Sequence, residues 1–482
     1  MKPLNPPAQH PLPSIPAPAD LAFVQVGGRH VVFNPDTLAL WETDAETARL
    51  GKRASPSLAD LPSRRPNLRL GNPNCTPQSL VLEVCQACNL GCRYCFVAHE
   101  NPGGTVGRKM DLATARRAID TLLPKRRDLR ISFFGGEPLL NWPLVEQVVD
   151  YAEVLARERG GRASFGVTTN GTLIGPDAAA FLKAHRFSLI VSVDGPKWIH
   201  DRNRPFKGTV GATGMVASSH GHTLAGLEAL RAIDYAGHVT LRGTYTPDCI
   251  HLAERLESLW SLRERGMGRN IDLEPACLSE TACVSGSREF DIEQLRGQYE
   301  SAADWFIARA NAGDQPMFHP FTVRLRRLLH REAALSECGA GTGYLSVNAA
   351  GDIFACHRMS ATRIGHLDYG IDEAARAPWL DNRVYQRSHC MKCPWRYVCG
   401  GGCRQDSMNL LGDIHTPTPL GCALTAIIVK QCIRIILEVG ADTLIEFIPP
   451  RGGRKPCSSP GTATASCPRP SSGASAPRTP AR

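Results

Sequence analysis

Three cysteines that could hold one inorganic centre stand close together early in the chain. Cys88, Cys92 and Cys95 have the spacing CxxxCxxC and follow an apolar run at residues 80–84. Thiolates are the usual ligands of a [4Fe–4S] cluster, and three of them leave the fourth iron open to a small molecule. A zinc site is the alternative, with His99 as the fourth ligand of a closed tetrahedron. The spacing therefore predicts a metal centre with an open position for chemistry.

A second segment, Phe-Phe-Gly-Gly-Glu-Pro at residues 133–138, has the features of a ligand site. Gly135 and Gly136 allow a ligand to approach the backbone closely, and the carboxylate of Glu137 can accept hydrogen bonds from an ammonium group. A lone Gly-Gly-Glu-Pro is more often an ordinary loop. Its place one strand–helix unit after the three cysteines favours a binding site.

Short β-like runs alternate with helical segments over residues 80–274, and these elements must position both motifs. Strands are predicted at residues 80–84, 129–134, 163–168, 188–193, 239–245 and 271–274. Helices are predicted between them at residues 112–122, 142–157, 177–184, 224–236 and 253–265. Six such repeats predict a parallel sheet that curls into a partial barrel. Ligands bind beyond the carboxyl ends of such strands, where both motifs lie.

The aromatic Tyr94 before the last cysteine gives the pattern CxxxCx-aromatic-C. Together with the Gly-Gly-Glu-Pro segment, this pattern resembles the radical S-adenosylmethionine (SAM) superfamily. The resemblance implies that a [4Fe–4S] cluster on Cys88, Cys92 and Cys95 binds SAM, and that residues 135–137 bind its amino group. SAM is then cleaved to a 5′-deoxyadenosyl radical.

Further strand ends fit the same superfamily. Asn170 follows the third predicted strand, and Ser192 and Asp194 lie at the end of the fourth. The resemblance places them near SAM, as candidates to contact its ribose or carboxylate, and structural turns are the alternative. Arg242, on the fifth strand, is a candidate carboxylate clamp.

Seven cysteines in the C-terminal part form the most specific pattern in the chain. They are Cys338, Cys356, Cys390, Cys393, Cys399, Cys403 and Cys422. Their spacing resembles the SPASM domain, which implies two auxiliary [4Fe–4S] clusters. The outer cluster would take Cys390, Cys393, Cys399 and Cys422, and the inner one Cys338, Cys356 and Cys403. A pair of zinc ribbons is the alternative.

The inner set lacks a fourth cysteine shortly before Cys338. Either Cys277 or Cys283 reaches back to it, or the inner cluster has an open iron that could bind a substrate thiolate. His357 follows Cys356, where sulfatase maturases commonly have Asp. This difference favours a resemblance to maturases that form thioether crosslinks in cysteine-containing peptides.

Composition limits the other classes. With 43% hydrophobic and 21% charged residues among 482, the chain is typical of soluble globular proteins. The net charge of +9 includes six basic residues of an acid-free tail, so nucleic-acid binding is not expected. The N-terminus lacks the features of a signal peptide, and we expect no membrane span. Eighteen clustered cysteines suit metal ligation in a reducing cytoplasm.

The expected organisation is an α/β chain built around a partial (β/α)6 radical SAM barrel. We expect disorder at residues 1–20, a small β-rich segment at 21–72, the barrel at 73–290, bridging helices at 291–337, a SPASM domain at 338–440 and a disordered basic tail at 449–482. The β-rich segment has a hairpin around Gly27-Gly28. This hairpin either accepts a peptide as an extra strand or packs on a neighbouring domain.

The resemblance implies an enzyme that modifies a peptide or protein, with a thioether crosslink as the main product. Its partners would be the substrate and a reductant such as a flavodoxin or ferredoxin. Formylglycine formation or a carbon–carbon crosslink is the alternative reaction, and a non-catalytic zinc or iron–sulfur scaffold is the non-enzyme alternative. The sequence alone identifies no catalytic acid or base.

Overall fold

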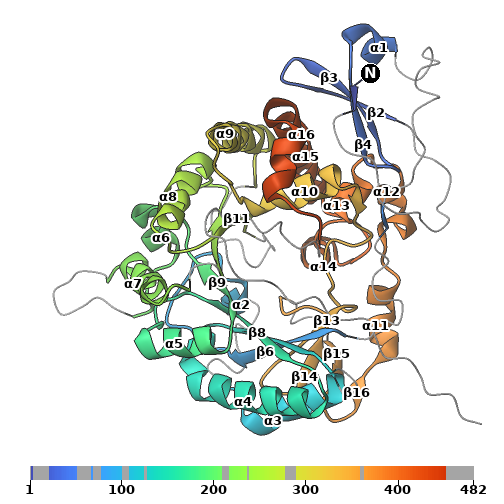
Figure 1. The fold of residues 1–482 in the computed structure, drawn as a ribbon. Coiled ribbons are helices and arrows are strands. Elements are labelled where there is room, and N and C mark those ends of the chain that lie inside the picture. Colours follow the sequence, from blue (N-terminus) through green and yellow to red (C-terminus); the bar gives the residue numbers. More distant parts are fainter. Residues whose placement is uncertain are drawn as a thin grey trace, which may run out of the picture.

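A computed structural model describes residues 2–3, 21–50, 67–68, 77–99, 108–123, 127–208, 217–235, 238–276, 289–358 and 363–451. All six predicted barrel strands are present in it, as the central sheet of the molecule (Figure 1). They are β6 (Ser79–Cys85), β7 (Leu129–Gly135), β8 (Ala163–Thr169), β9 (Ser188–Ser192), β10 (Val239–Tyr245) and β11 (Asn270–Pro275). They pair in sequence order and run parallel, which confirms the predicted partial barrel.

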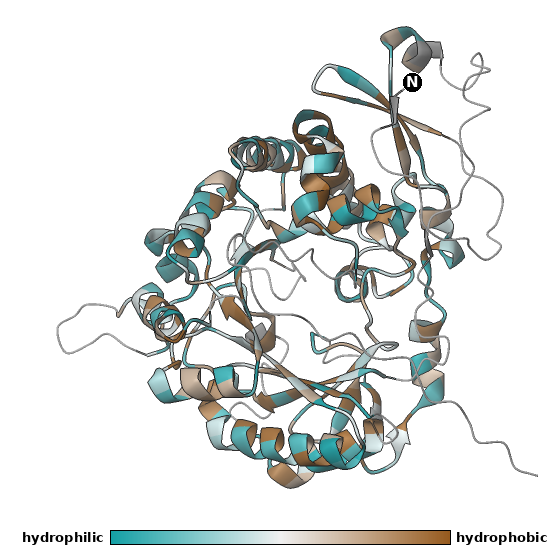
Figure 2. Ribbon diagram, viewed as in Figure 1, coloured by the Kyte–Doolittle hydropathy of each residue, from teal (hydrophilic) through white to brown (hydrophobic). Residues whose placement is uncertain are grey.

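Amphipathic helices cover the outside of this sheet. They are α3 (Leu112–Leu122), α4 (Trp142–Glu158), α5 (Pro176–Ala184), α7 (Ser219–Ala232) and α8 (Leu252–Glu264), with the unpredicted short helix α6 (Lys197–Asn203) after β9. In Figure 2, the outer helices have both hydrophobic and hydrophilic faces. Asp111 caps α3 by accepting a hydrogen bond from the Thr114 amide, as its position before the apolar periodicity requires.

The sheet continues into the cysteine-rich C-terminal part, which the sequence alone did not indicate. Strand β13 (Tyr344–Val347) pairs parallel with β6, with Leu345 opposite Leu80. Strands β14 (Asp352–Phe354), β15 (Arg363–His366) and β16 (Gly370–Ile371) follow as antiparallel neighbours. The two regions expected as separate domains therefore share one ten-stranded sheet, because β13 covers the edge that β6 would otherwise leave open.

Several short helices lie in the cysteine-rich C-terminal part. Four of them are α11 (Glu373–Leu380), α12 (Ser388–Met391), α13 (Arg396–Cys399) and α14 (Arg404–Leu411). Three longer or terminal helices, α9 (Ile292–Asn311), α10 (His319–Leu329) and α16 (Ala441–Phe447), lie with α15 (Pro419–Val439) at the upper side of Figure 1. Cys390 lies in α12, Cys399 ends α13, and Cys422 lies in the first turn of α15.

Helix α15 corrects the expectation that no apolar run approaches a membrane span. Among the described residues, α15 is the one helix that is both long enough and apolar enough to cross a membrane. The mean hydropathy of its most apolar window is 1.9. Half of that window is buried inside the protein, where α15 packs on α9 and α10. This burial is the arrangement of a core helix.

The N-terminal hairpin forms as predicted. Strands β2 (Ala22–Val26) and β3 (Arg29–Asn34) join through Gly27 and Gly28, whose φ angles of 55° and 73° suit a tight two-residue turn. Strand β4 (Ala39–Thr43) adds a third strand, and β1 (Lys2–Pro3) pairs with β4. Residues 2–3 therefore form a short strand, in contrast to the expected disorder of residues 1–20, because they pair with β4.

One face of this small sheet packs on the C-terminal region. Phe33 stacks on Trp395 with ring centroids 5.1 Å apart, and Asp36 pairs with Arg396. This contact corresponds to the packing role of the hairpin that the sequence left open. Further short elements are α1 (Ala45–Leu50), and β5 (Asn67–Leu68) paired with β12 (Glu332–Ala333).

Candidate functional site

A cavity of about 460 Å³ lies inside the barrel and is lined by most of the site residues predicted within the barrel. Residues from both ends of the chain line it. Cys88, Cys92 and Cys95 contribute to one wall, and the predicted residues Gly135, Gly136, Asn170, Ser192 and Arg242 also line it. Tyr344, His357 and Arg358 add lining from the C-terminal part. The cavity therefore joins the barrel to the cysteine-rich region.

The three cysteines lie in the loop between β6 and α2 (Phe96–His99). Burial raises the pKa of the Cys88 thiol to about 11 and that of Cys92 to about 12, and the charge of Cys95 raises both. Buried thiols whose ionisation is opposed by burial and by a neighbouring cysteine are suited to a strongly positive metal centre, which binds them as thiolates. The side chain of His99, the alternative zinc ligand, lies outside the described residues.

Gly135 and Gly136 bring the end of β7 into close contact with the cysteine loop. A Cβ at Gly135, where φ is 139°, would lie 2.1 Å from the Cys85 carbonyl oxygen, and one at Gly136 would lie 2.5 Å from that of Ala87. The Gly136 amide donates to the Cys85 carbonyl at 2.7 Å. The two glycines therefore fix the loop as well as leaving room beside it.

Gly136→Ala is expected to displace residues 86–87 and to reduce both cluster incorporation and stability, by about 1–3 kcal/mol of unfolding free energy. Iron content after anaerobic reconstitution and a denaturant melt would measure the two effects. Gly297→Ala is the matched control. A Cβ at Gly297 meets no atom within 4 Å, and the residue is exposed to solvent between the two ends of α9. An unchanged iron content in Gly136→Ala would contradict the prediction.

Glu137 does not line the cavity, although the sequence placed it at the amino group of SAM. Its carboxylate is fully buried and accepts hydrogen bonds from the Thr169 hydroxyl at 2.7 Å and from the Asn170 amide at 2.8 Å. The Leu139 amide donates to it at 3.1 Å. Burial raises the pKa of Glu137 to about 7 against these bonds. In this structure Glu137 ties β7 to the end of β8.

Asn170 lines the cavity beside the first cysteine. Its side-chain amide donates to Asn89 Oδ1 at 2.8 Å and lies 3.9 Å from the Cys88 sulfur, and its Oδ1 accepts from the Thr172 amide and hydroxyl. Asn89 also donates to the Thr172 hydroxyl at 2.9 Å. These bonds fix the start of the cysteine loop against the end of β8.

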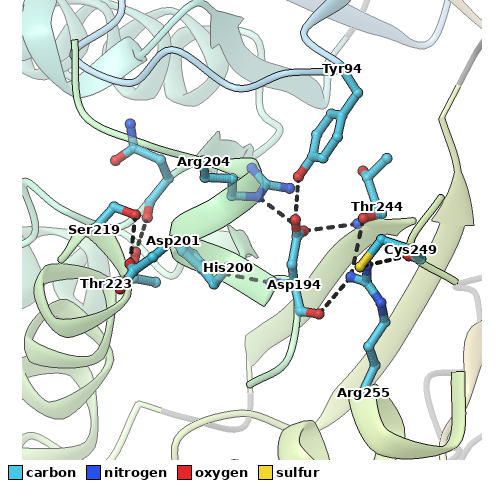
Figure 3. Close-up of polar contacts among 11 residues, drawn as sticks. Tyr94, Asp194, His200, Asp201, Arg204, Ser219, Thr223, Thr244, Cys249 and Arg255 are labelled. Atoms are coloured by element: carbon cyan, nitrogen blue, oxygen red, sulfur yellow. Dashed lines mark hydrogen bonds and ion pairs between the residues drawn. The ribbon is translucent and has the colours of Figure 1, made fainter. Parts of the chain in front are cut away.

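Asp194 is fully buried, and Figure 3 shows its polar contacts with Tyr94, Arg204 and Thr244. It accepts hydrogen bonds from the Tyr94 hydroxyl at 2.6 Å, from Arg204 Nε at 3.0 Å and from the Thr244 amide at 3.0 Å. All three donor residues line the cavity. Burial disfavours its charge, but Arg204 and Arg255 outweigh it and lower the pKa of Asp194. Asp194 thus positions Tyr94, which stands between two of the cysteines.

Arg242 reaches the cavity from β10 but is already paired. It contacts Glu274 and lies 3.7 Å from Asp272, both on the neighbouring strand β11. The carboxylate clamp predicted from the sequence therefore has protein carboxylates as its partners in this structure. Ser192, at the end of β9, lines the cavity.

The C-terminal cysteines fall into two groups. Cys390, Cys393 and Cys399 lie close enough to Cys422 that their charges add to burial in raising its pKa to about 11. Cys338, Cys356 and Cys403 form the second group: burial raises the pKa of Cys356 and of Cys403, and the charge of Cys338 adds to both. These groups are the two sets that the SPASM resemblance implies. Cys277 and Cys283 lie outside the described residues.

The second group lies directly behind the cavity wall. The Tyr344 hydroxyl, from a residue that lines the cavity, donates to the Cys356 sulfur at 3.3 Å. His357 packs edge-on against Phe134 at 4.4 Å, with no hydrogen-bond partner for its Nδ1. Sequence patterns missed Tyr344, Arg204 and Glu274 as lining residues, and only the His-Asp-Arg-Asn-Arg run around Arg204 gave a signal.

The predicted ligands of all three centres are free cysteine thiols, the usual ligands of iron–sulfur clusters. The groups of three and four thiols therefore suit [4Fe–4S] clusters, and the cavity beside the first three leaves space for a ligand.

Residues 82–245 match the radical SAM superfamily, so this part of the chain is a radical SAM domain. An uncharacterized protein of Methanocaldococcus jannaschii, MJ0907, is 38% identical over 27% of this chain and 42% of its own length. The radical SAM cyclopropyl synthase TigE of Paramaledivibacter caminithermalis is 21% identical over 74% of each chain. A serine-type anaerobic sulfatase-maturating enzyme of Klebsiella aerogenes is 26% identical over 67% of this chain and 78% of its own length.

A solved structure shares the fold. Native anSMEcpe with bound AdoMet and the Cp18Cys peptide superimposes with a TM-score of 0.61 at 17% identity, over 76% of this chain and 99% of that one. Its extent shows that the fold similarity spans both the barrel and the C-terminal part.

Proposed function

Because the chain is a radical SAM enzyme whose homologues are SPASM-type maturases, we propose that it forms a thioether crosslink in a cysteine-containing peptide. A [4Fe–4S] cluster held by Cys88, Cys92 and Cys95 would, together with SAM, supply a 5′-deoxyadenosyl radical. The chain itself must bind SAM and the peptide, orient them and exclude water.

One observation carries this proposal. A single cavity has Cys88, Cys92 and Cys95 on one wall and Tyr344, which contacts Cys356, on another. A peptide in this cavity would lie between the centre that starts radical chemistry and the inner auxiliary group. That arrangement suits a reaction that removes a hydrogen atom and then an electron from the same substrate.

The cavity also offers groups for SAM. Backbone around Gly135 and Gly136 is the candidate site for the amino group, and Ser192, Asn170 and Arg204 are candidates for the carboxylate and ribose. Arg204 faces the cavity while Asp194 holds its Nε. Asp194 and Glu137 would then act by positioning these neighbours.

The cysteine count of the inner group favours a thioether product. Cys338, Cys356 and Cys403 are three ligands, and three ligands leave one iron for a substrate thiolate. A fourth ligand from Cys277 or Cys283 would weaken this preference. Formylglycine formation is the second candidate, since a sulfatase-maturating enzyme is among the relatives.

Coexpression with a short cysteine-rich peptide encoded beside the gene would test the proposal. We expect the peptide to lose two hydrogens and the cysteine thiol to resist alkylation. A carbonyl at Ser with loss of two hydrogens, or a carbonyl at Cys in which oxygen replaces the sulfur, would favour formylglycine. Zinc at stoichiometric levels, with no 5′-deoxyadenosine formed, would reject both reactions.

Cys356→Ala is expected to separate the two kinds of centre. The reconstituted protein should lose about four of about twelve irons and should still cleave SAM, but should not release modified peptide. Iron analysis and EPR spectroscopy measure the first effect, and mass spectrometry the last. Cys432→Ala, at a buried cysteine outside both groups, is the control that should keep all irons.

A further inference from the structure

Two acidic residues stand beside each other at the end of β11. Glu274 is the single Asp or Glu among the described residues that line the cavity. Asp272, two residues earlier and therefore on the same face of the strand, is 5% exposed. Arg242 on β10 bridges the two, since it contacts Glu274 and lies 3.7 Å from Asp272 Oδ2. Arg242 thus holds both carboxylates in one place.

Asp272 connects this pair to the surface. Its Oδ1 is buried without a hydrogen-bond partner and lies 3.5 Å from Nδ1 of His319, at the start of α10. The His319 side chain is 52% exposed, whereas that of Asp272 is 7% exposed. Glu274, Asp272 and His319 therefore follow one another from the cavity to solvent.

The surroundings of the two carboxylates differ. Burial opposes the charge of Glu274, but Arg242 and Arg358 outweigh it and lower the pKa of Glu274. Burial and the charge of Glu274 raise the pKa of Asp272, against His319, Arg242 and Arg324. Paired acids whose environments separate their pKa values are suited to pass a proton.

The proposed reaction requires such an acceptor. One hydrogen atom leaves the peptide carbon for the 5′-deoxyadenosyl radical, giving 5′-deoxyadenosine. The C–S bond then forms, with loss of one electron to an iron–sulfur acceptor and of one proton from the thiol. Formylglycine formation releases a proton and an electron in the same way. Either route leaves one proton to be removed from the cavity.

We propose that Glu274 accepts this proton from the substrate and that Asp272 and His319 pass it to solvent. Glu274 is the catalytic residue of the three, because it faces the cavity. Asp272 and His319 act through it as positioning and relay residues. The inference rests on the proposed function for its substrate, and its proton path can be tested without one.

The first test uses the coexpressed peptide in fully deuterated form with the reconstituted full chain. Glu274→Gln should still transfer deuterium into 5′-deoxyadenosine at a rate near that of wild type. The yield of modified peptide per 5′-deoxyadenosine should fall on the order of a hundredfold, and Glu274→Asp should restore part of it. Glu146→Gln, outside the cavity lining, is the matched control.

An unchanged yield in Glu274→Gln would overturn the proposal. If the yield of modified peptide falls in His357→Gln but not in Glu274→Gln, the proposal is also overturned, and proton transfer is assigned to His357. If wild type modifies no peptide and forms no 5′-deoxyadenosine, the proposed function fails, and the second test still decides whether the path exists.

The second test needs no substrate. Infrared spectroscopy of the full chain should show a protonated carboxyl band that persists above the pH at which an exposed aspartate ionises, and Asp272→Asn should remove it. After mixing with D₂O, exchange of this band should slow in His319→Leu, while Glu264→Gln on α8 leaves it unchanged. Absence of the band, or equal exchange in His319→Leu, would overturn the relay.

Discussion

Alanine at Cys88, Cys92 and Cys95 together is expected to abolish SAM cleavage. The thiolates would be the only protein ligands of the SAM-binding cluster, so no iron would remain to reduce SAM. Because the two C-terminal groups keep their cysteines, the variant should retain about eight of about twelve irons. Chromatographic detection of 5′-deoxyadenosine and iron analysis of the reconstituted protein measure both results.

The expected iron content distinguishes loss of the site from loss of the fold. Cys249→Ala, at a buried cysteine beside Arg255, is the control for handling of the thiols. Continued turnover in the triple variant would show that SAM is cleaved elsewhere, and the site assignment would be wrong. Loss of all irons would show instead that the three centres assemble together.

Asp194→Ala is expected to have the largest effect on stability of any single change discussed. It would leave the buried guanidinium of Arg204 without its carboxylate, and breaking a buried ion pair from one side costs about 3–5 kcal/mol. Tyr94 and the Thr244 amide would lose their acceptor as well. A urea melt of wild type and variant measures the unfolding free energy.

A surface ion pair gives the matched comparison. Asp248 pairs with Arg202 at 2.7 Å, with both side chains about two-fifths exposed, and Asp248→Ala should cost less than about 1 kcal/mol. Asp194→Asn should lie between the two, because it keeps a hydrogen-bond acceptor but not the charge. Equal melts for Asp194→Ala and Asp248→Ala would contradict the role assigned to Asp194.

The repeating pattern of the barrel was predictable because each strand is a short apolar run bounded by turn residues. Val239–Tyr245 and Leu112–Leu122 have the bounds that the pattern gave. The two C-terminal cysteine groups were predictable for a different reason, since they follow from the resemblance of the seven-cysteine pattern to the SPASM domain.

The orientation of individual side chains was not predictable in this way. Glu137 and Asp194 lie in the expected loops, but their carboxylates do not line the cavity. Thr169 and Asn170 donate hydrogen bonds to the Glu137 carboxylate, and Arg204 donates one to Asp194. Tyr344 reaches the cavity only through the pairing of β13 with β6. Glu274 was placed within a strand, and its facing direction depends on packing that a strand pattern does not contain.

The pairing of β13 with β6 also determines when the barrel can be completed during synthesis. Ser346 donates a hydrogen bond to Glu83, and 263 residues separate them. Contacts over such distances form late and slow folding. Until residues 344–347 leave the ribosome, β6 has an unpaired edge and the cysteine loop beside it stays accessible. Nascent chains that stop earlier would expose that edge to aggregation, so cluster assembly and protection of the chain depend on the same late strand.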